Sequence, residues 1–350
     1  MRAAWFCLLW IAISSPSAFA ATCSGAATPL KIISKDLARN ATSAAENLLA
    51  PLETAYPDCA ELLLARARIK AAQGAAVEAQ ALFLRYLGLA PDDSTGMAYF
   101  ARFLIDQAEY QRADDLSAAA LDRNSGDPAA LAVRGQILDM KRQSQQGLEL
   151  LNKACELDPD NADVQFQLGA LYDRAKQPAD AVKHFEKVVD LDPGYSPAWD
   201  YLALNLEPLG EVDRADAAYK KGLAVNQEGP HFDAFLDYNY GRFLAKRNQL
   251  VESKKHLDRA VELVPEFRAT WYDRAKLNLR LRNYTEARTD AEKAASLTEQ
   301  TGGIIELQIY SLLEQIYRRL GETELAEKYA ALTRETPPPA RKGYQQAAPQ

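Results

Sequence analysis

The chain has 350 residues, of which 48% are hydrophobic and 25% charged, as in an ordinary globular protein and unlike an intrinsically disordered one. Gly and Pro number 17 each, too few for a collagen-like or low-complexity chain. The formal net charge is −7, whereas a nucleic-acid-binding chain carries a basic excess, so binding to RNA or DNA is not expected.

The N-terminal residues 1–20 have the pattern of a secretory signal peptide. Arg2 supplies the positive charge, residues 3–13 form an apolar stretch, and residues 18–20 (Ala-Phe-Ala) match the cleavage pattern of small residues. The apolar stretch is too short to span a bilayer, although an uncleaved membrane anchor is the alternative interpretation. We therefore expect an exported chain, periplasmic or extracellular, that begins near Ala21 and has no integral membrane span.

Export would place the cysteines in an oxidising compartment. Cleavage of the signal removes Cys7 and leaves three cysteines, an odd number that requires at least one free thiol or an intermolecular bond. Cys23 and Cys59 bracket the N-terminal segment and are the candidate disulfide pair, with two free thiols as the alternative. Cys155 lies in an apolar helical stretch, which predicts a buried and inert thiol.

A period of 34 residues runs through the chain. Pro57, Pro91, Pro159 and Pro193 stand in one register, and Ser125 occupies the slot between the second and third of them. Small residues keep the same period twelve positions earlier, at Ala45, Ala79, Ala113, Gly147, Ala181 and Ala215. A fixed period of this length predicts a repeat array, and it directs the search for function to binding surfaces.

Residues 162–195 form the clearest unit of this period. Each half spaces its apolar residues as one face of a helix requires, and residues 176–178 (Lys-Gln-Pro) form the turn between the halves. Gly169 and Ala181 are small, which predicts that two antiparallel helices cross closely there. Pro193 ends the second helix because it has no N–H to continue the hydrogen-bond ladder.

This pattern resembles the tetratricopeptide repeat family over about residues 30–335. The residues that carry the resemblance in the clearest unit are Leu168, Gly169, Tyr172, Ala181, Phe185 and Pro193. The resemblance implies an all-α fold, a right-handed α-solenoid of antiparallel helix pairs. We expect eight repeats within residues 60–335, with starts near 60, 94, 128, 162, 196, 234, 268 and 307. Residues 21–59 are interpreted as an N-terminal segment with a degenerate half-repeat, and residues 336–350 as a disordered tail.

The register departs from regularity in two ways. It slips by four residues before 234 and by five before 307, so extra length is expected at residues 227–230 and 301–303. Arginine also occupies the seventh position, which is usually apolar, at Arg66, Arg134 and Arg274.

The resemblance implies a concave groove lined by the first helix of each unit, through its second, fifth, ninth and twelfth residues. The units near 94 and 128 place small residues there, among them Ala98, Ala129 and Ala132. Small side chains predict weak contacts with a ligand. The units near 162 and 196 contribute Phe166 and Asp200 to the predicted groove.

The units near 234 and 268 carry the predicted partner-binding cluster. Its members are Phe235, Tyr238, Arg242, Tyr272 and Lys276. Aromatic and Arg side chains dominate the energetics of protein interfaces, and the two cations could pair with a peptide carboxylate. The alternative interpretation is that the aromatic residues pack between neighbouring helices while the cations are ordinary solvated surface.

The sequence lacks the motifs of an enzyme. The three histidines are far apart, the cysteines lack zinc spacing, and no phosphate loop or nucleophile elbow is present. We therefore expect a non-catalytic chain with no cofactor and no metal, which binds a protein or peptide partner through its groove. The alternative function is a scaffold subunit of a cell-envelope assembly, such as polysaccharide-export or pilus machinery, that contacts its partners by its edges.

Overall fold

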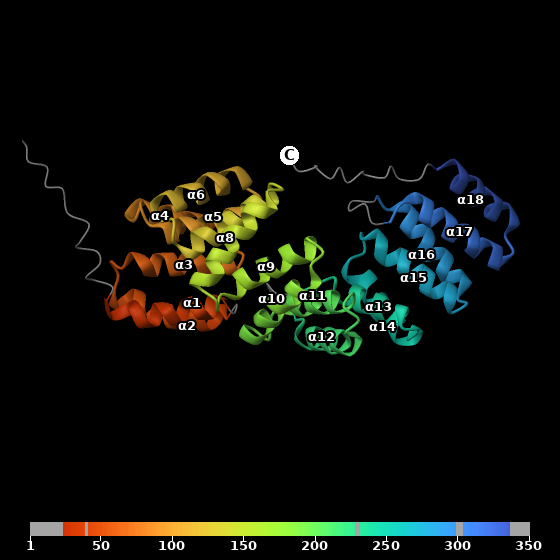
Figure 1. Ribbon diagram of the computed structural model, residues 1–350, viewed down its shortest axis with the longest axis horizontal. Helices are drawn as coiled ribbons and strands as arrows, with labels where there is room; N and C mark the ends of the chain where they lie inside the picture. Colours follow the sequence, from red (N-terminus) through yellow and green to blue (C-terminus); the bar gives the residue numbers. More distant parts are fainter. Residues whose placement is uncertain (1–23, 39–40, 228–231, 299–303, 337–350) are drawn as a thin grey trace, which may run out of the picture. The chain divides into compact units, whose positions relative to one another are not determined.

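The computed structural model describes residues 24–38, 41–227, 232–298 and 304–336. The predicted signal peptide, Cys23, the C-terminal tail after Thr336, most of residues 227–230 and all of 301–303 lie outside the described residues. Within the described ranges, every regular element is a helix (Figure 1). No helix in these ranges is both long enough and apolar enough to cross a lipid bilayer.

The chain divides into two compact units, with the boundary after Gly210. Unit 1 holds the short 3-10 helix η2 (Ser24–Ala26), α1 (Ala27–Ala38), α2 (Thr42–Ala55), α3 (Ala60–Ala72), α4 (Ala76–Leu89), α5 (Ser94–Asp106), α6 (Tyr110–Arg123), α7 (Pro128–Met140), α8 (Ser144–Leu157), α9 (Ala162–Arg174), α10 (Pro178–Leu191) and α11 (Ser196–Leu206). Unit 2 holds α12 (Val212–Val225), α13 (Leu236–Lys246), α14 (Leu250–Leu263), α15 (Arg268–Arg280), α16 (Tyr284–Ser296), α17 (Glu306–Leu320) and α18 (Thr323–Glu335).

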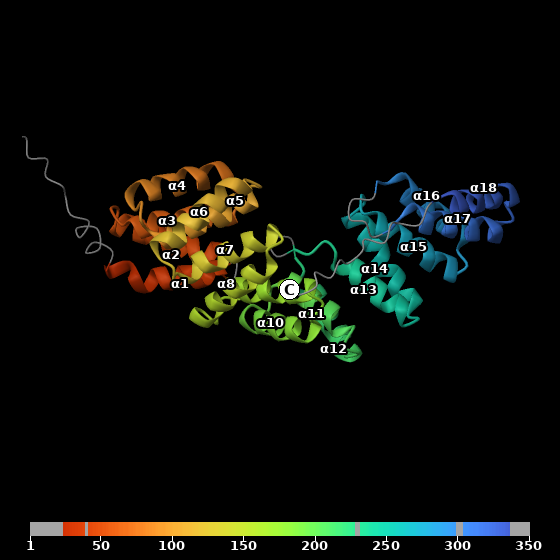
Figure 2. The ribbon, with the colours of Figure 1, turned by 45° about the horizontal axis from the view of Figure 1, so that its top comes forward.

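Within each unit, successive helices pack in antiparallel pairs, so the fold is an α-solenoid, as the sequence predicts. Pairs such as α7 with α8 in unit 1 and α15 with α16 in unit 2 lie side by side in both views (Figure 2). The N-terminal segment differs from its prediction as a half-repeat, because α1 and α2 form a full helix pair that packs on α3. Ala45 keeps the register of the small residues, and it buries an apolar face together with Ile33 and Leu49.

The small residues of the 34-residue register lie where paired helices cross. Ala79, Ala113 and Ala181 are completely buried. A Cβ atom placed on Gly147 in α8 would lie 2.7 Å from the backbone oxygen of Gly135 in α7, far inside van der Waals contact. The two helix backbones therefore touch at this point, and only glycine permits so close an approach.

The turn inside each helix pair uses one left-handed residue at the fifteenth position of the unit. Glycine occupies this position in three units, as Gly74, Gly210 and Gly321, each with a positive φ. The remaining five units place other residues there at φ between 59° and 66°, namely Ala108, Arg142, Lys176, Asn248 and Arg282. Because the same backbone geometry recurs whatever the side chain, the turn is dictated by the packing of the helices and not by local preference.

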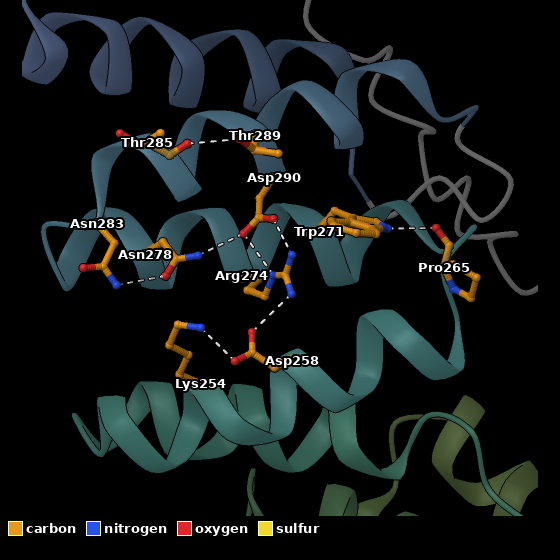
Figure 3. A network of polar contacts seen from close by, with 10 residues as sticks. All are labelled: Lys254, Asp258, Pro265, Trp271, Arg274, Asn278, Asn283, Thr285, Thr289 and Asp290. Carbon is orange, nitrogen blue, oxygen red and sulfur yellow. Dashed lines mark hydrogen bonds and ion pairs between the residues drawn. The ribbon is translucent and has the colours of Figure 1, made fainter.

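The seventh-position arginines are explained by carboxylates on the second helices. Arg66 contacts Glu46 and Glu53 of α2, and Arg134 contacts Asp114 of α6. In unit 2, Arg274 of α15 lies between Asp258 of α14 and Asp290 of α16 (Figure 3). The charge at a usually apolar position is therefore neutralised by ion pairs that join neighbouring helices.

The two described cysteines, Cys59 and Cys155, differ in oxidation state. Cys59 is buried and disulfide-bonded. Its predicted partner, Cys23, lies outside the described residues, so that pairing stays a prediction. Cys155 is a free thiol and is only partly buried, not fully buried as expected. Burial raises the pKa of the Cys155 thiol, which keeps it protonated and unreactive.

Candidate functional site

A hollow of about 180 Å³ in unit 2 gathers four basic residues around one carboxylate. Helices α13 and α15 supply the charged groups, which are Arg242, Lys246, Asp273, Lys276 and Arg280. Leucine side chains, including Leu277, form part of its apolar wall. The excess of positive charge is local, since the whole chain carries a formal net charge of −7. We call this hollow the basic hollow.

Asp273 holds the cations of the basic hollow in position. Its Oδ2 lies 3.3 Å from Nε of Arg242, and its Oδ1 lies 3.6 Å from Nζ of Lys276. The hydroxyl of Tyr238 also donates a hydrogen bond to Oδ2 at 3.0 Å. Arg242 and Lys276 share the single carboxylate of Asp273, so this pair of cations keeps a net positive charge.

The ends of α13 and α15 also fix Arg280. Its guanidinium donates to the backbone oxygen of Ala245 at 2.8 Å and to Oδ1 of Asn248 at 3.0 Å. Both acceptors are neutral, so the positive charge of Arg280 is oriented but is not cancelled by these bonds.

The structure brings Arg242 and Lys276 together as the sequence predicts, but it gives Tyr238 a different role. Tyr238 is only 7% exposed and packs edge-on against the ring of Phe267 at 5.3 Å. Packing between helices, the alternative interpretation, therefore describes this residue. Tyr238 cannot offer its ring to a ligand, because helix packing already covers it, and it acts through its hydroxyl on Asp273.

The other two predicted aromatic residues keep accessible surface. Phe235, the residue before α13, is 43% exposed and touches Phe267 with one edge at 5.2 Å. Tyr272 is half-buried, and Nζ of Lys276 lies 5.2 Å from its ring centre. These rings could accept an apolar side chain beside a bound carboxylate.

Phe166 and Asp200 belong to unit 1, whereas the other five predicted residues belong to unit 2. Phe166 packs within an aromatic cluster, with Tyr195 at 5.0 Å and Tyr201 at 5.6 Å between ring centres. Asp200 is buried, so it is not the solvent-facing groove residue that was expected. Both positions therefore serve the packing of α9 and α11 within unit 1.

A second hollow, of about 340 Å³, lies on the first helices of unit 1 and was missed by the sequence analysis. Ala98, Ala129 and Ala132 line it, and these are the residues that predicted weak contacts with a ligand. Their small side chains leave the space that forms the hollow. Arg68 and Arg102 reach it from the ninth position of their units, the position that Arg242 and Lys276 hold in unit 2. That shared register was the signal available in the sequence.

Two polar atoms in this hollow lack a hydrogen-bond partner. Nε of Arg102 is buried without a hydrogen bond, although it forms an ion pair with Oδ1 of Asp106 at 3.9 Å. The side-chain oxygen of Gln167 is likewise buried and unbonded. Burial raises the pKa of the Asp106 carboxyl, although the nearby Arg102 opposes that shift. A buried polar group without a hydrogen bond costs free energy, so Nε of Arg102 and the side-chain oxygen of Gln167 are a donor and an acceptor that would gain from a partner.

Nothing in the described residues resembles a metal centre, because no three His, Cys, Asp or Glu side chains stand close enough to share an ion. The two described histidines contact neighbouring side chains within their own units. His184 stacks on Tyr172 at 5.3 Å, and His256 contacts Asp237 at 2.7 Å.

Helix pairs repeated with a period of 34 residues define an α-solenoid. Models of the tetratricopeptide repeat match residues 150–183 and residues 241–300. The chain therefore contains tetratricopeptide repeats.

Two curated proteins share this repeat region at low identity. The human protein O-mannosyl-transferase TMTC3 is 27% identical over 173 residues, which cover 49% of this chain and 19% of that protein. A homologue of DnaJ subfamily C member 7 from Dictyostelium discoideum is 24% identical over 245 residues, which cover 66% of this chain and 41% of the relative. The chain thus spans less than half the length of either relative.

Among solved structures, the APC/C hetero-tetramer Cut9-Hcn1 has a similar fold. Its TM-score is 0.59 at 15% sequence identity, over 78% of this chain and 52% of that chain. At this identity the likeness concerns the fold alone.

Proposed function

We propose that this chain is an exported, non-catalytic binding protein that holds an acidic segment of a protein or peptide partner on the first helices of unit 2. The observation that carries the proposal is the basic hollow, where Arg242, Lys276 and Arg280 outnumber the single carboxylate of Asp273. A fixed excess of positive charge attracts anions and raises their rate of association.

The dimensions of the basic hollow favour a side chain over a large ligand. About 180 Å³ accommodates one or two carboxylate side chains and is below the usual size of a cofactor pocket. The exposed face of Phe235 and the half-buried ring of Tyr272 could hold an apolar neighbour of that acidic residue. An acidic peptide segment with an interspersed apolar residue fits these features.

The binding proposal is tested by the affinity of a fluorescein-labelled peptide of alternating Glu and Leu, with a Gln-for-Glu peptide as reference. The variant is Lys276→Glu, and the matched control is Lys255→Glu. Both lysines are exposed in unit 2, and each has one acidic partner three residues earlier.

We expect Lys276→Glu to weaken binding of the Glu peptide about tenfold, which corresponds to about 1.4 kcal/mol. The control should stay within about twofold, because surface charge pairs contribute little. Equal binding by both variants, or equal affinity for the Gln peptide, would refute the basic hollow as the site.

The export proposal rests on the N-terminal pattern of residues 1–20 and is supported by the disulfide at Cys59, since such bonds persist in oxidising compartments. The intact mass of the protein secreted by, or released from the periplasm of, an expressing bacterium tests it. We expect a mass that begins near Ala21, and non-reducing peptide mapping should find Cys59 joined to Cys23. A full-length chain retained in the cytosol would contradict export.

The non-catalytic part of the proposal concerns this chain only. The name of the human relative is that of a mannosyl-transferase, but the matched region is 19% of that protein. The repeat region is therefore taken as the binding part that the two proteins share.

A further inference from the structure

A further hollow lies away from the first-helix surface, at the turns of unit 1. It measures about 800 Å³. The last turns of α7 and α9 line it together with the first turns of α6 and α8. These segments meet at the edge of the solenoid, where each first helix turns into its second helix. We call this the edge hollow.

The edge hollow has an apolar base and exposed apolar walls. Ile137 and Leu171 form the buried base. Tyr110, the first residue of α6, is 54% exposed, and Met140, the last residue of α7, is 44% exposed. Two large apolar side chains are therefore exposed to water beside a cavity. This arrangement is more typical of an interaction site than of an ordinary protein surface.

Basic residues border the edge hollow, and its carboxylates already have partners. Asp114 accepts from Lys141 at 2.6 Å, and it also pairs with Arg134. Asp139 pairs with Arg174 and accepts a hydrogen bond from the hydroxyl of Ser144 at 2.8 Å. Since both acidic groups are engaged, they do not repel an incoming anion strongly.

Arg142 is the basic residue with charge to offer. It is exposed, and it makes no ion pair or hydrogen bond within the described ranges. Its backbone holds the left-handed position of the turn, at φ 65°, so the side chain leaves a fixed point on the border of the hollow. A free guanidinium beside an apolar cavity is a suitable partner for a carboxylate.

We infer that the edge hollow is a second binding site, for a segment of a partner protein in which an apolar side chain stands next to Asp or Glu. The apolar side chain would lie against Tyr110 and Met140, and the carboxylate would pair with Arg142. A volume of about 800 Å³ holds several side chains, and it is within the range of ligand sites. The inference is independent of the proposed function, because the edge hollow and the basic hollow share no residue.

The experiment selects displayed random heptapeptides on the full chain and then compares their binding to two variants. Arg142→Glu reverses the charge at the edge hollow. Arg282→Glu is the matched control, because Arg282 is also exposed and holds the same left-handed turn position, at φ 66°, in unit 2. Met140→Ser removes apolar surface and leaves the charge unchanged.

We expect peptides that pair an aliphatic or aromatic residue with Asp or Glu, bound about tenfold more weakly by Arg142→Glu and by Met140→Ser but normally by Arg282→Glu. Thermal unfolding followed by circular dichroism should be alike for the two arginine variants, which excludes loss of fold as the cause. Selection of basic peptides, or of none that distinguish Arg142→Glu from Arg282→Glu, would overturn the inference. So would a dimer that sedimentation velocity detects in the parent chain and not in Arg142→Glu, because a second copy would then occupy the hollow.

Discussion

Arg274 and Asp290 form a two-point ion pair between α15 and α16 (Figure 3). Nε of the arginine lies 3.0 Å from Oδ2 of the aspartate, and Nη2 lies 2.5 Å from Oδ1. Asn278 donates to the same Oδ2 at 2.9 Å, and Asp258 of α14 accepts from Nη1 at 3.1 Å. Asp290 is only 2% exposed, so its carboxylate is stabilised by Arg274 and Asn278 and not by water.

Removing one partner should therefore cost more than removing both. We expect Asp290→Ala to lower the free energy of unfolding by about 3 kcal/mol, because it leaves the Arg274 guanidinium with an unmatched charge between the helices. Replacing Arg274 and Asp290 together by leucine should cost less than Asp290→Ala, since apolar residues of similar volume often substitute for a buried ion pair, although the Asn278 amide then loses its acceptor. Urea unfolding followed by circular dichroism measures both, and a double variant less stable than Asp290→Ala would contradict this account.

The repeat register alone does not identify the ion-pair partners of the seventh-position arginines. The pattern marked Arg66, Arg134 and Arg274 as departures, but it assigned them no partner. The partners Glu46 and Asp114 lie 20 residues earlier than Arg66 and Arg134, on a preceding second helix. That spacing follows from the repeat length. Carboxylates at this offset therefore identify a partner for two of the three arginines.

The contact between the backbones of α7 and α8 gives a second prediction. Gly147→Ala would place a methyl group 2.7 Å from the oxygen of Gly135, and a backbone atom cannot move aside without separating the helices. We expect a loss of about 2–3 kcal/mol in the free energy of unfolding, as for other overpacked sites.

Gly88→Ala is the control for this change. Gly88 lies within α4, and a Cβ atom there would meet nothing within 4 Å. Alanine should therefore stabilise the helix by about 0.5–1 kcal/mol through its better helix propensity. Equal effects of the two substitutions would show that helix propensity, not the close approach, decides the result.

The left-handed turns give a third prediction, of opposite sign. Lys176 holds φ 60°, which costs a non-glycine residue about 1–2 kcal/mol. Lys176→Gly relieves that strain, but part of the gain is lost to the greater freedom of glycine in the unfolded chain. We expect a net stabilisation of about 0.5 kcal/mol, measured by urea unfolding.

The reverse change at the equivalent turn tests the same cause. Gly74 has φ 74° with open space around it, so Gly74→Ala introduces backbone strain without a steric clash. It should destabilise by about 1 kcal/mol. If Gly74→Ala were neutral, the turn would have no left-handed cost to relieve at Lys176.

The period of the sequence predicted the fold well because the repeat is a packing rule. The first helices begin at Ala60, Ser94, Pro128, Ala162 and, in unit 2, at Leu236, Arg268 and Glu306, which follows the register read from the sequence. Buried small residues and helix ends repeat at fixed offsets, so the helix boundaries assigned in one unit support those assigned in the next.

The site was harder to predict, because residue type alone does not give the space that a side chain leaves. Ala98 and Ala132 were interpreted as weak contacts, yet they form a hollow by being small. Tyr238 was interpreted as a ligand contact, yet Phe267, which is 29 residues away in the sequence, buries it. Both outcomes depend on neighbours from other helices, which a single register position does not reveal.

A final prediction concerns pH and His184 in α10. Nδ1 of His184 lies 2.7 Å from Oε1 of Gln165, and the imidazole stacks on the ring of Tyr172. Burial is the main cause that lowers the pKa of His184 below its ordinary value of 6.5, although Asp180 opposes this shift. The folded protein thus binds the proton less readily than the unfolded chain does.

The sign of the pH effect follows from that difference. Well above pH 6.5 the imidazole is neutral in both states, and its full contribution to stability is present. As the pH falls below this value, the unfolded chain is protonated first, so the free energy of unfolding decreases until the folded form is protonated as well. We expect His184→Phe, which retains a ring against Tyr172, to lose this component of the pH dependence.

Urea unfolding of the parent chain and of His184→Phe at pH 8, 7, 6 and 5 measures the effect. The two proteins should show the same slope of stability against pH between pH 7 and 8, where His184 is neutral in both states, and this is the internal control. Below pH 6.5 the parent should lose stability more steeply than the variant. Parallel curves over the whole range would mean that His184 titrates alike in both states, and the buried stack on Tyr172 would then have no effect on its protonation.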